Sequence, residues 1–222
     1  MEEHLVKVFS IEQVTHDVKR FRIEKPPGYS FIPGQATEVS VNIPEWKNEK
    51  RPFTFTCLNE APYLEFTIKI YHSRNGVTNE LGKLSPGDEL IIRDVWGAIS
   101  YKSAGIFIAG GAGVTPFIAI LRDLHKKNEL TGNKLLFANK TRADIILHDE
   151  FNRLLGRDFI NILSDEKAEG YWHGLINEEF LKEYIDDFNK NIYVCGPPPM
   201  IDMVLNQLAD LGIEKNSITL EL

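Results

Sequence analysis

The stretch IFIAGGAGVTP, residues 106–116, decides the fold of the second half of the chain. Its apolar start predicts a buried strand that ends in a glycine-rich turn. Thr115 and Pro116 are typical of a helix N-cap and of the first helical position. Apolar residues then recur at helical spacing over 117–124, so the stretch predicts a strand, a tight turn and an amphipathic helix.

The same alternation of strand and helix continues to the end of the chain. Apolar strands are predicted at 135–138, 159–163, 192–195 and 218–220, and helices at 149–155, 178–188 and 200–211. Strands that alternate with helices are typical of a parallel sheet with helices on both faces. We therefore predict a C-terminal α/β domain with a doubly wound parallel sheet over residues 104–222.

The first half of the chain has a different pattern. Apolar and polar residues alternate strictly over 64–70, as in a half-buried strand, and shorter alternating runs lie around 21–24, 39–43 and 53–57. Clusters of proline, glycine and asparagine separate these runs, and one short helix is predicted at 77–84. The pattern predicts a six-stranded antiparallel β-barrel over residues 1–100, with the domain boundary near 97–104.

Composition limits the class of protein. The 222 residues carry a net charge of −7, which disfavours a nucleic-acid partner. The two cysteines, Cys57 and Cys195, are too few for a four-cysteine zinc or iron–sulfur site, and the histidines do not cluster, so no metal site is predicted. The sequence lacks a signal-peptide pattern and an unbroken apolar stretch long enough for a bilayer. These features favour a cytoplasmic protein with no membrane span.

Two loops in the second half follow predicted strands and precede helices. They are Gly110–Pro116 and Cys195–Met200, the latter reading CGPPPM. In an open α/β sheet both loops lie at the carboxyl edge, where ligands bind, and glycines let a ligand approach the backbone. Taken singly, each loop is more typical of a plain strand-to-helix turn than of a ligand site. A lone buried cysteine such as Cys195 is more often a core thiol than a reactive group.

Two further motifs lie in the barrel half. Arg51-Pro52-Phe53-Thr54 places a guanidinium, an aromatic ring and a hydroxyl on one strand, groups that suit a phosphate, a flat heterocycle and a ring nitrogen. Gly76-Val77-Thr78 opens the predicted helix with backbone amides and a hydroxyl that suit an anion. Taken singly, the first motif is more typical of a strand with a core phenylalanine, and the second of an ordinary helix cap.

The order of these four motifs along nearly the whole chain resembles the ferredoxin–NADP reductase superfamily. In that family an R-x-[YF]-[ST] strand holds a flavin and a glycine turn holds its diphosphate. The resemblance implies that Arg51 neutralises the diphosphate of FAD, that Phe53, next to Pro52, stacks on the flavin, and that Thr54 lies near flavin N5. It further implies that Gly76-Val77-Thr78, one residue shorter than the family pattern, binds the diphosphate.

The resemblance also assigns the nucleotide loops. It implies that Gly111, Gly113 and Thr115 receive the nicotinamide dinucleotide. Cys195 and Gly196 are then expected to flank the nicotinamide where its hydride-bearing carbon faces the flavin. The implied catalytic residues are thus Thr54 and Cys195.

The sequence departs from the family pattern at three places. Phe53 replaces the more frequent tyrosine, which removes a phenol hydroxyl. The chain stops at Glu221-Leu222 with no terminal aromatic residue, and Glu221 is either a catalytic proton relay or an exposed terminal residue. Lys140 and Arg142 are both candidates for pairing a 2′-phosphate, so the preference between NADH and NADPH is left open.

We therefore predict an FAD-dependent oxidoreductase that takes hydride from NAD(P)H and passes electrons singly to a separate acceptor, with flavodoxin or ferredoxin as the first candidates. A basic stretch at 19–25 is either a solvated face or a contact for an acidic redox partner. Two alternatives stay open at this point: a reductase of free flavin or ferric complexes, and an electron-relay or nucleotide-sensing subunit of a larger complex.

Overall fold

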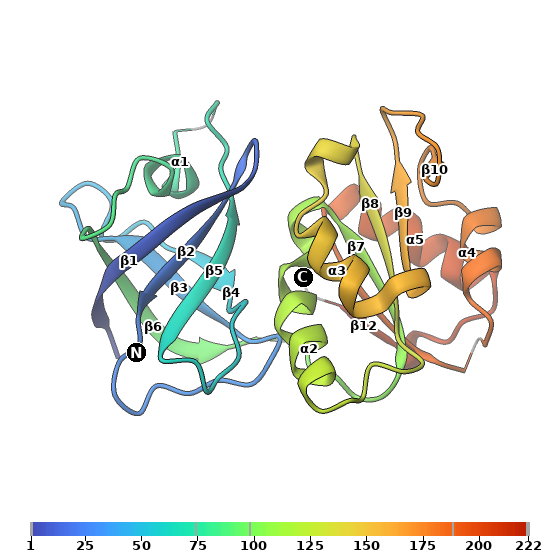
Figure 1. Cartoon of the computed structure of the whole chain (residues 1–222), viewed down its shortest axis with the longest axis horizontal. Helices are drawn as coiled ribbons and strands as arrows, with labels where there is room; N and C mark the ends of the chain where they lie inside the picture. Colours follow the sequence, from blue (N-terminus) through green and yellow to red (C-terminus); the bar gives the residue numbers. More distant parts are fainter. Residues whose placement is uncertain (1, 74, 98, 188, 221–222) are drawn as a thin grey trace. The chain divides into compact units, whose positions relative to one another are not determined.

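The computed structural model describes residues 2–73, 75–97, 99–187 and 189–220, which group into two compact units (Figure 1). The first unit comprises residues 1–100 and 115–123, and the second comprises 101–114 and 124–222. Among the described residues, none of the helices has the length and apolar character needed to cross a bilayer.

The first unit contains a six-stranded antiparallel sheet in the order β4-β3-β6-β1-β2-β5. The two edges of this sheet meet just beyond β4, where Phe55 bridges to Phe66 and the Thr56 amide donates to the Glu65 carbonyl at 2.8 Å. The sheet therefore closes on itself, as predicted for a barrel. Its elements are β1 (His4–Thr15), β2 (Val18–Glu24), β3 (Ala36–Val41), β4 (Arg51–Thr54), β5 (Tyr63–Lys69), α1 (Val77–Leu81) and β6 (Glu89–Trp96).

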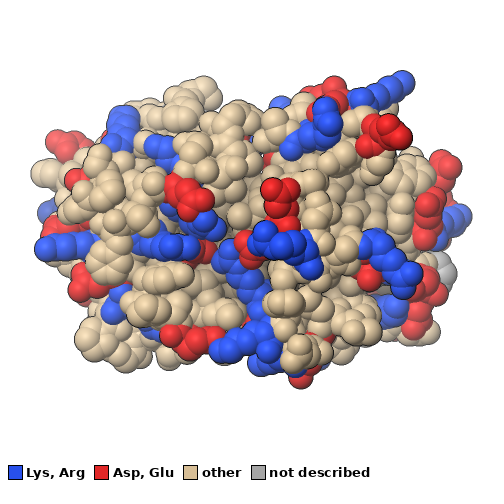
Figure 2. Space-filling model, in the orientation of Figure 1, with Lys and Arg blue, Asp and Glu red and all other residues tan. Residues whose placement is uncertain are grey.

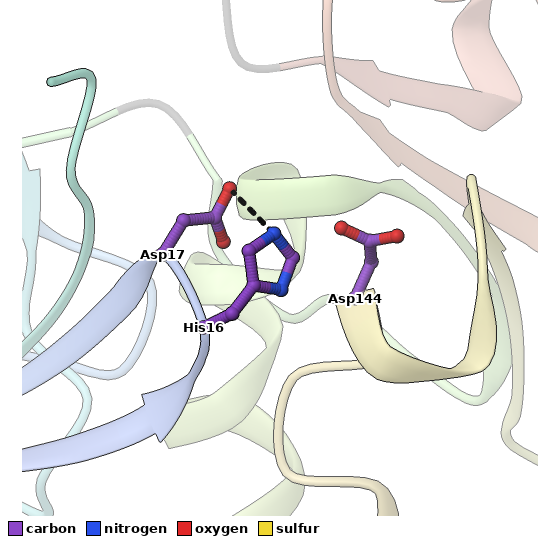
Figure 3. Close-up of side chains that lie close together, drawn as sticks. All are labelled: His16, Asp17 and Asp144. Carbon is purple, nitrogen blue, oxygen red and sulfur yellow. Dashed lines mark ion pairs between the residues drawn. The ribbon is translucent and has the colours of Figure 1, made fainter.

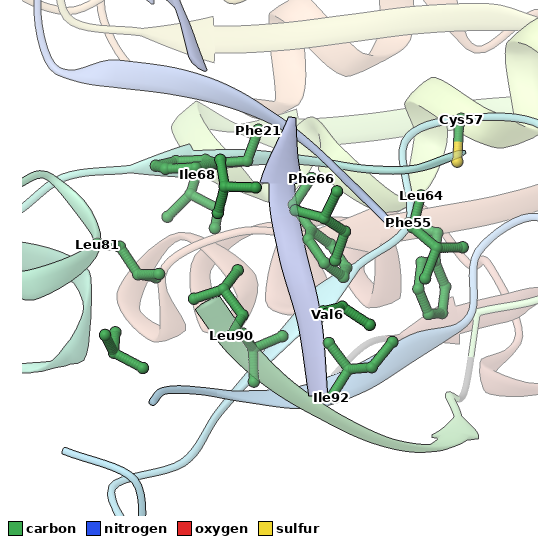
Figure 4. Packing of buried hydrophobic residues seen from close by; sticks show 14 of the residues in the cluster. Val6, Phe21, Phe55, Cys57, Leu64, Phe66, Ile68, Leu81, Leu90 and Ile92 are labelled. Carbon is green, nitrogen blue, oxygen red and sulfur yellow. The ribbon is translucent and has the colours of Figure 1, made fainter. Parts of the chain in front are cut away.

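The barrel core is built from the inward side chains of all these strands (Figure 4). Phe21, Phe55 and Phe66 are fully buried. Burying each such side chain stabilises the fold by roughly 1.5–3 kcal/mol. Val77 and Leu81 of α1 join the same core, so α1 is fixed to the barrel by its apolar face.

The polar face of β5 differs from the sequence prediction. Alternation over 64–70 predicts that Glu65 and Thr67 are exposed, yet both are buried. The reason is a polar network: Arg22 donates to Glu65 at 3.1 Å, Arg122 at 2.8 Å, and Thr56 Oγ1 at 3.1 Å. A buried carboxylate is tolerated here because two cations and a hydroxyl surround it.

The second unit contains six parallel strands in the order β10-β9-β8-β7-β11-β12. One face of the sheet packs on α4 and α5, through residues such as Phe180 and Val204. On the other face Phe137 of β8 meets Phe151 of α3 edge-on at 6.4 Å. Helices thus cover both faces, which confirms the doubly wound prediction.

The bounds in the second half are close to the predicted ones, with three differences. The helix predicted at 178–188 ends at Tyr184, and residue 188 lies outside the described part of the chain. A 3₁₀ turn precedes α2, and β10 is an added short strand. The elements are β7 (Gly105–Gly110), η1 (Gly111–Val114), α2 (Thr115–Lys126), β8 (Lys134–Asn139), η2 (Arg142–Asp144), α3 (His148–Leu155), η3 (Gly156–Asp158), β9 (Phe159–Leu163), β10 (Trp172–His173), α4 (Glu178–Tyr184), β11 (Asn191–Cys195), α5 (Pro198–Asp210), η4 (Lys215–Ser217) and β12 (Ile218–Leu220).

Candidate functional site

The strand order of the second unit contains a switch point between β7 and β11. From β7 the chain adds β8, β9 and β10 on one side of the sheet, then returns to place β11 on the other side of β7. The connections that follow β7 and β11 therefore lead to opposite sides of the sheet, β7 towards β8 and β11 towards β12. The carboxyl edge at such a switch point is the general ligand site of open α/β sheets, and the two predicted glycine loops lie there.

The two loops are in direct contact through their glycines. A Cβ atom added at Gly113 would overlap the Cys195 carbonyl and lie 2.6 Å from the Gly196 Cα atom. A Cβ added at Gly110 would lie 3.0 Å from Pro197 Cδ, and one at Gly196 would lie 2.8 Å from Met200 Cε. At Gly113 backbone meets backbone, so this position needs glycine for the two loops to reach this geometry.

Gly111 is different from its neighbours. Its φ is +51°, and an added Cβ would have no atom within 4 Å. Gly111 is half-buried with open space on the side where a Cβ would point, whereas Val114 and Cys195 are buried. Open space beside a glycine backbone fits a dinucleotide that comes close to the main chain.

The predicted flavin strand lies at one edge of the barrel sheet. Arg51 and Pro52 are exposed, Phe53 is half-buried and Thr54 is buried. The Phe53 ring packs against the barrel core, with its centroid 6.3 Å from that of Phe66. The strand thus offers a guanidinium and the free part of an aromatic ring, held in place by the core.

The α1 turn offers its backbone. The Val77 side chain is buried in the barrel core, while Gly76 has extended backbone (φ −155°) and no atom within 4 Å of an added Cβ. Neither conformation nor packing therefore requires glycine at 76, and no side chain caps the helix. Open space at an uncapped turn fits a diphosphate oxygen approaching the amides, so the residues present fit FAD.

Arg142 lies in η2, just beyond the carboxyl end of β8, and is already paired. Its Nε donates to Glu166 Oε1 at 2.6 Å and its backbone amide donates to Glu166 Oε2 at 2.8 Å. These hydrogen bonds lower the pKa of Glu166 below its ordinary value. Glu166 was not predicted from the sequence, because it follows a different strand and only the parallel pairing of β8 with β9 brings it to Arg142.

Other candidate groups are held by contacts inside one unit. Lys19, Arg20, Arg22 and Lys25 of the basic stretch contact Gly82, Glu12, Glu65 and Asn59, respectively. Acidic and basic side chains are interspersed on the face in Figure 2. The basic stretch is therefore occupied by intrachain contacts.

Three polar side chains, His16, Asp17 and Asp144, are drawn in Figure 3. His16 lies 3.6 Å from Asp17 in the turn between β1 and β2. Asp144 belongs to the second unit, where its carboxylate accepts hydrogen bonds from the backbone amide and hydroxyl of Thr141. Glu221, the predicted proton relay, lies outside the described residues.

Comparison with family models identifies both halves. Residues 5–101 match an oxidoreductase FAD-binding domain and residues 107–206 match an oxidoreductase NAD-binding domain. Together with the barrel, the doubly wound sheet and the glycine loops, these matches define the class as flavin- and nicotinamide-dependent oxidoreductases. The chain belongs to the ferredoxin–NADP reductase superfamily, with FAD and NAD(P) as its cofactors.

Individual relatives include reductases with different partners. The chain is 28% identical to the reductase component of propane 2-monooxygenase from Rhodococcus jostii, over 96% of this chain and 61% of that protein. It is 27% identical to NADH-cytochrome b5 reductase 1 of Pyricularia oryzae, over 91% of this chain and 72% of the relative. The chain thus spans about three fifths to three quarters of the length of these relatives.

Solved structures support the fold. The FAD/NAD-binding domain of nitric oxide dioxygenase from Vibrio cholerae superposes with a TM-score of 0.87 at 22% identity, covering 98% of this chain and 97% of that domain. At this identity the likeness establishes the architecture alone.

Proposed function

We propose that the chain transfers hydride from NAD(P)H to bound FAD and passes the electrons singly to an acceptor outside these 222 residues. The observation that carries this proposal is the contact of Gly113 with the Cys195–Gly196 backbone at the switch point of the parallel sheet. A bound flavin supplies a ring that accepts hydride and releases electrons one at a time. The chain supplies binding, alignment and exclusion of water.

The barrel strand β4 holds the flavin in this proposal. Arg51 pairs the diphosphate, because its guanidinium is exposed and always charged. Phe53 stacks on the flavin with the part of its ring that the core leaves uncovered, and Pro52 stiffens the edge strand between them. Thr54, buried at the strand end, lies near N5 and is a catalytic residue in this assignment.

The α1 turn holds the flavin diphosphate. Gly76 lets phosphate oxygens approach the backbone, and the amides of the first turn donate to them. The Thr78 hydroxyl adds a donor, whereas Val77 contributes only its amide because its side chain is in the core.

The glycine loops hold the nicotinamide nucleotide. Gly111 and Gly113 present backbone to the dinucleotide, and Thr115 begins α2 directly behind them. Cys195 and Gly196, fixed against Gly113, flank the nicotinamide ring. In this assignment residues 1–100 form the flavin domain and residues 104–222 the nucleotide domain.

The acceptor is a redox protein in our proposal. The two cysteines of the sequence are buried in the described structure, so these residues supply no iron–sulfur cluster of their own. Flavodoxin and ferredoxin are the first candidates, and the names of the relatives add cytochrome b5 and an oxygenase component. We place the reaction in the cytoplasm, where NAD(P)H is available and free thiols stay reduced.

Arg51→Ala is expected to weaken FAD binding about 10- to 100-fold, because it removes charge-assisted hydrogen bonds worth ~1.5–3 kcal/mol. Flavin content after gel filtration and an FAD titration of the apoprotein measure the change. Lys50→Ala is the matched control, since it removes a neighbouring positive charge that pairs with Glu38 at 3.6 Å. Full FAD retention by the Arg51 variant would refute its assignment.

The two alternatives predict different behaviour. A free-flavin or ferric reductase releases its flavin during purification, whereas the proposed enzyme retains FAD. A relay or sensing subunit copurifies with a partner and shows negligible NAD(P)H-dependent dye reduction by itself. Purified protein that retains FAD and reduces ferricyanide with NAD(P)H supports the proposal over both.

A further inference from the structure

Glu166 uses both of its carboxylate oxygens on Arg142. One oxygen accepts from the guanidinium at 2.6 Å and the other from the backbone amide at 2.8 Å. The Arg142 side chain is 60% exposed, so the ion pair is accessible to solvent and to a ligand. The carboxylate therefore both neutralises Arg142 and fixes where it stands.

The pair lies along the carboxyl edge of the sheet. β8 and β9 are parallel and in register to their last residues, with Asn139 opposite Leu163. The pairing continues beyond the strands, because the Ser164 amide donates to the Asn139 carbonyl at 3.0 Å and the Asp165 amide to the Lys140 carbonyl at 2.9 Å. The loops that carry Arg142 and Glu166 thus run side by side, and β7 with the glycine loop is the next strand along.

A dinucleotide bound at the glycine loop extends over this edge. In open α/β folds its adenosine ribose lies beyond the next strand, where a carboxylate accepts from the 2′-hydroxyl or an arginine pairs a 2′-phosphate. Here the arginine already carries a carboxylate. A 2′-phosphate that approached Arg142 would be repelled by the negative charge of Glu166. The hydroxyls of an unmodified ribose can instead donate hydrogen bonds to the Glu166 carboxylate.

We propose that Glu166 is a specificity-determining residue that makes the chain select NADH over NADPH, by occupying Arg142 and by accepting from the adenosine ribose. This inference rests on the proposed function, because it uses the same nucleotide site. In this proposal NADPH is disfavoured because Glu166 repels its 2′-phosphate. The site does contain a positively charged residue, Arg142, so a lack of positive charge is not the reason.

Two neighbouring side chains, His148 and Lys140, are alternatives to Arg142 as partners of a 2′-phosphate. His148 is held by the Tyr171 hydroxyl at 3.0 Å and by Asn152 at 3.2 Å. Lys140 lies on the same loop, and a 2′-phosphate bound by Lys140 would not lose affinity when Arg142 is replaced. The double variant Glu166→Gln, Arg142→Leu therefore distinguishes binding by Lys140 from binding by Arg142.

The test compares the wild type with Glu166→Gln. For the wild type we expect kcat/KM with NADH to be at least about tenfold higher than kcat/KM with NADPH. For Glu166→Gln we expect kcat/KM with NADPH to rise about tenfold or more, because a single charge-assisted contact has an effect of this size. Titration calorimetry with 2′,5′-ADP and with ADP gives a second readout that needs no flavin. The glutamine variant is expected to gain affinity for 2′,5′-ADP only.

Two further variants serve as controls. Asp165→Asn removes an exposed carboxylate one residue away that accepts from Ser164, and it should leave the NADH-to-NADPH ratio unchanged. Adding Arg142→Leu to Glu166→Gln should abolish the gain in 2′,5′-ADP affinity; persistence of the gain would assign the phosphate to Lys140 and overturn the role of Arg142.

The failure modes are distinguishable. A wild type that uses NADPH as well as NADH, or a Glu166→Gln variant with an unchanged ratio, overturns the role of Glu166 while leaving the proposed function intact. Failure of both nucleotides to reduce the flavin overturns the proposed function, and the 2′,5′-ADP titration still tests the selectivity.

Discussion

Replacing Glu65 with alanine is expected to lower the free energy of unfolding by about 3–5 kcal/mol, because it leaves two guanidinium groups facing a site that no longer holds an anion. Glu65 is only 2% exposed and accepts from Arg22, Arg122 and Thr56. Against a total stability of roughly 5–15 kcal/mol this is a large fraction. Urea unfolding followed by far-ultraviolet circular dichroism measures the change.

The control is Glu12→Ala, which removes an exposed carboxylate that pairs with Arg20 and should alter stability less than loss of the buried Glu65. Glu65→Gln tests the charge separately, because the amide keeps an oxygen for Thr56 but carries no negative charge. An unfolding midpoint for Glu65→Ala equal to that of Glu12→Ala would contradict the buried network.

The same carboxylate makes stability depend on pH. Burial alone would raise the pKa of Glu65, but the charge and hydrogen bonds of Arg122 and the hydrogen bond from Arg22 outweigh it, holding the pKa below its ordinary value of 4.5. The folded protein therefore binds this proton less tightly than the unfolded chain. The contribution of Glu65 is complete above about pH 4.5 and is lost as pH falls through the folded-state pKa. The stability difference between wild type and Glu65→Gln should shrink over that acid range.

Gly113→Ala is expected to reduce the rate of flavin reduction by NAD(P)H about 100-fold, the penalty for a shift of about 1 Å in a positioning loop. The added Cβ would lie 2.6 Å from Gly196 Cα and would force apart the two loops at the switch point. Flavin content should stay normal, because the proposed flavin residues lie in β4 and α1. Stopped-flow reduction at 450 nm in the absence of oxygen measures the rate, and dithionite confirms that the flavin itself is reducible.

Gly105→Ala is the matched control for this loop. Gly105 lies at the opposite end of β7, and its added Cβ would lie 2.9 Å from the Asn191 carbonyl carbon of β11. The two substitutions strain the same pair of strands at opposite edges of the sheet. Gly105→Ala should lower the thermal midpoint while leaving the reduction rate of folded, FAD-loaded protein near the wild-type value. Equal rate losses in both variants would show a general effect on folding instead of a role for the loop.

Local patterns were enough to predict the architecture. The apolar run and glycines at 106–113 predicted β7 and its turn, and alternation over 64–70 predicted β5. These signals are local, because the spacing of apolar residues that identifies a strand or a helix is a property of residues close together in the sequence. The long first strand, β1, was not delimited, since its outer face mixes Leu5 and Phe9 with charged residues.

The remaining features depend on residues far apart in the sequence. Alternation predicted an exposed Glu65, but Arg122, 57 residues away, helps to bury it. The sequence offered Arg142 as a candidate for pairing a 2′-phosphate, but it did not show that Glu166, 24 residues away, pairs with it through the β8–β9 register. Spacing along one chain does not encode such pairings, because they follow from strand order. The same reason explains why the contact of Gly113 with Cys195 became visible only in the folded sheet.

Hydride transfer to the flavin is tested by the visible spectrum of the purified, FAD-reconstituted protein before and after adding NADH without oxygen. Our account predicts a bound-flavin spectrum whose band near 450 nm bleaches on addition of NADH and returns on admission of air. A protein that binds no FAD, or whose bound flavin ignores both NADH and NADPH while dithionite reduces it, would contradict the proposed hydride transfer.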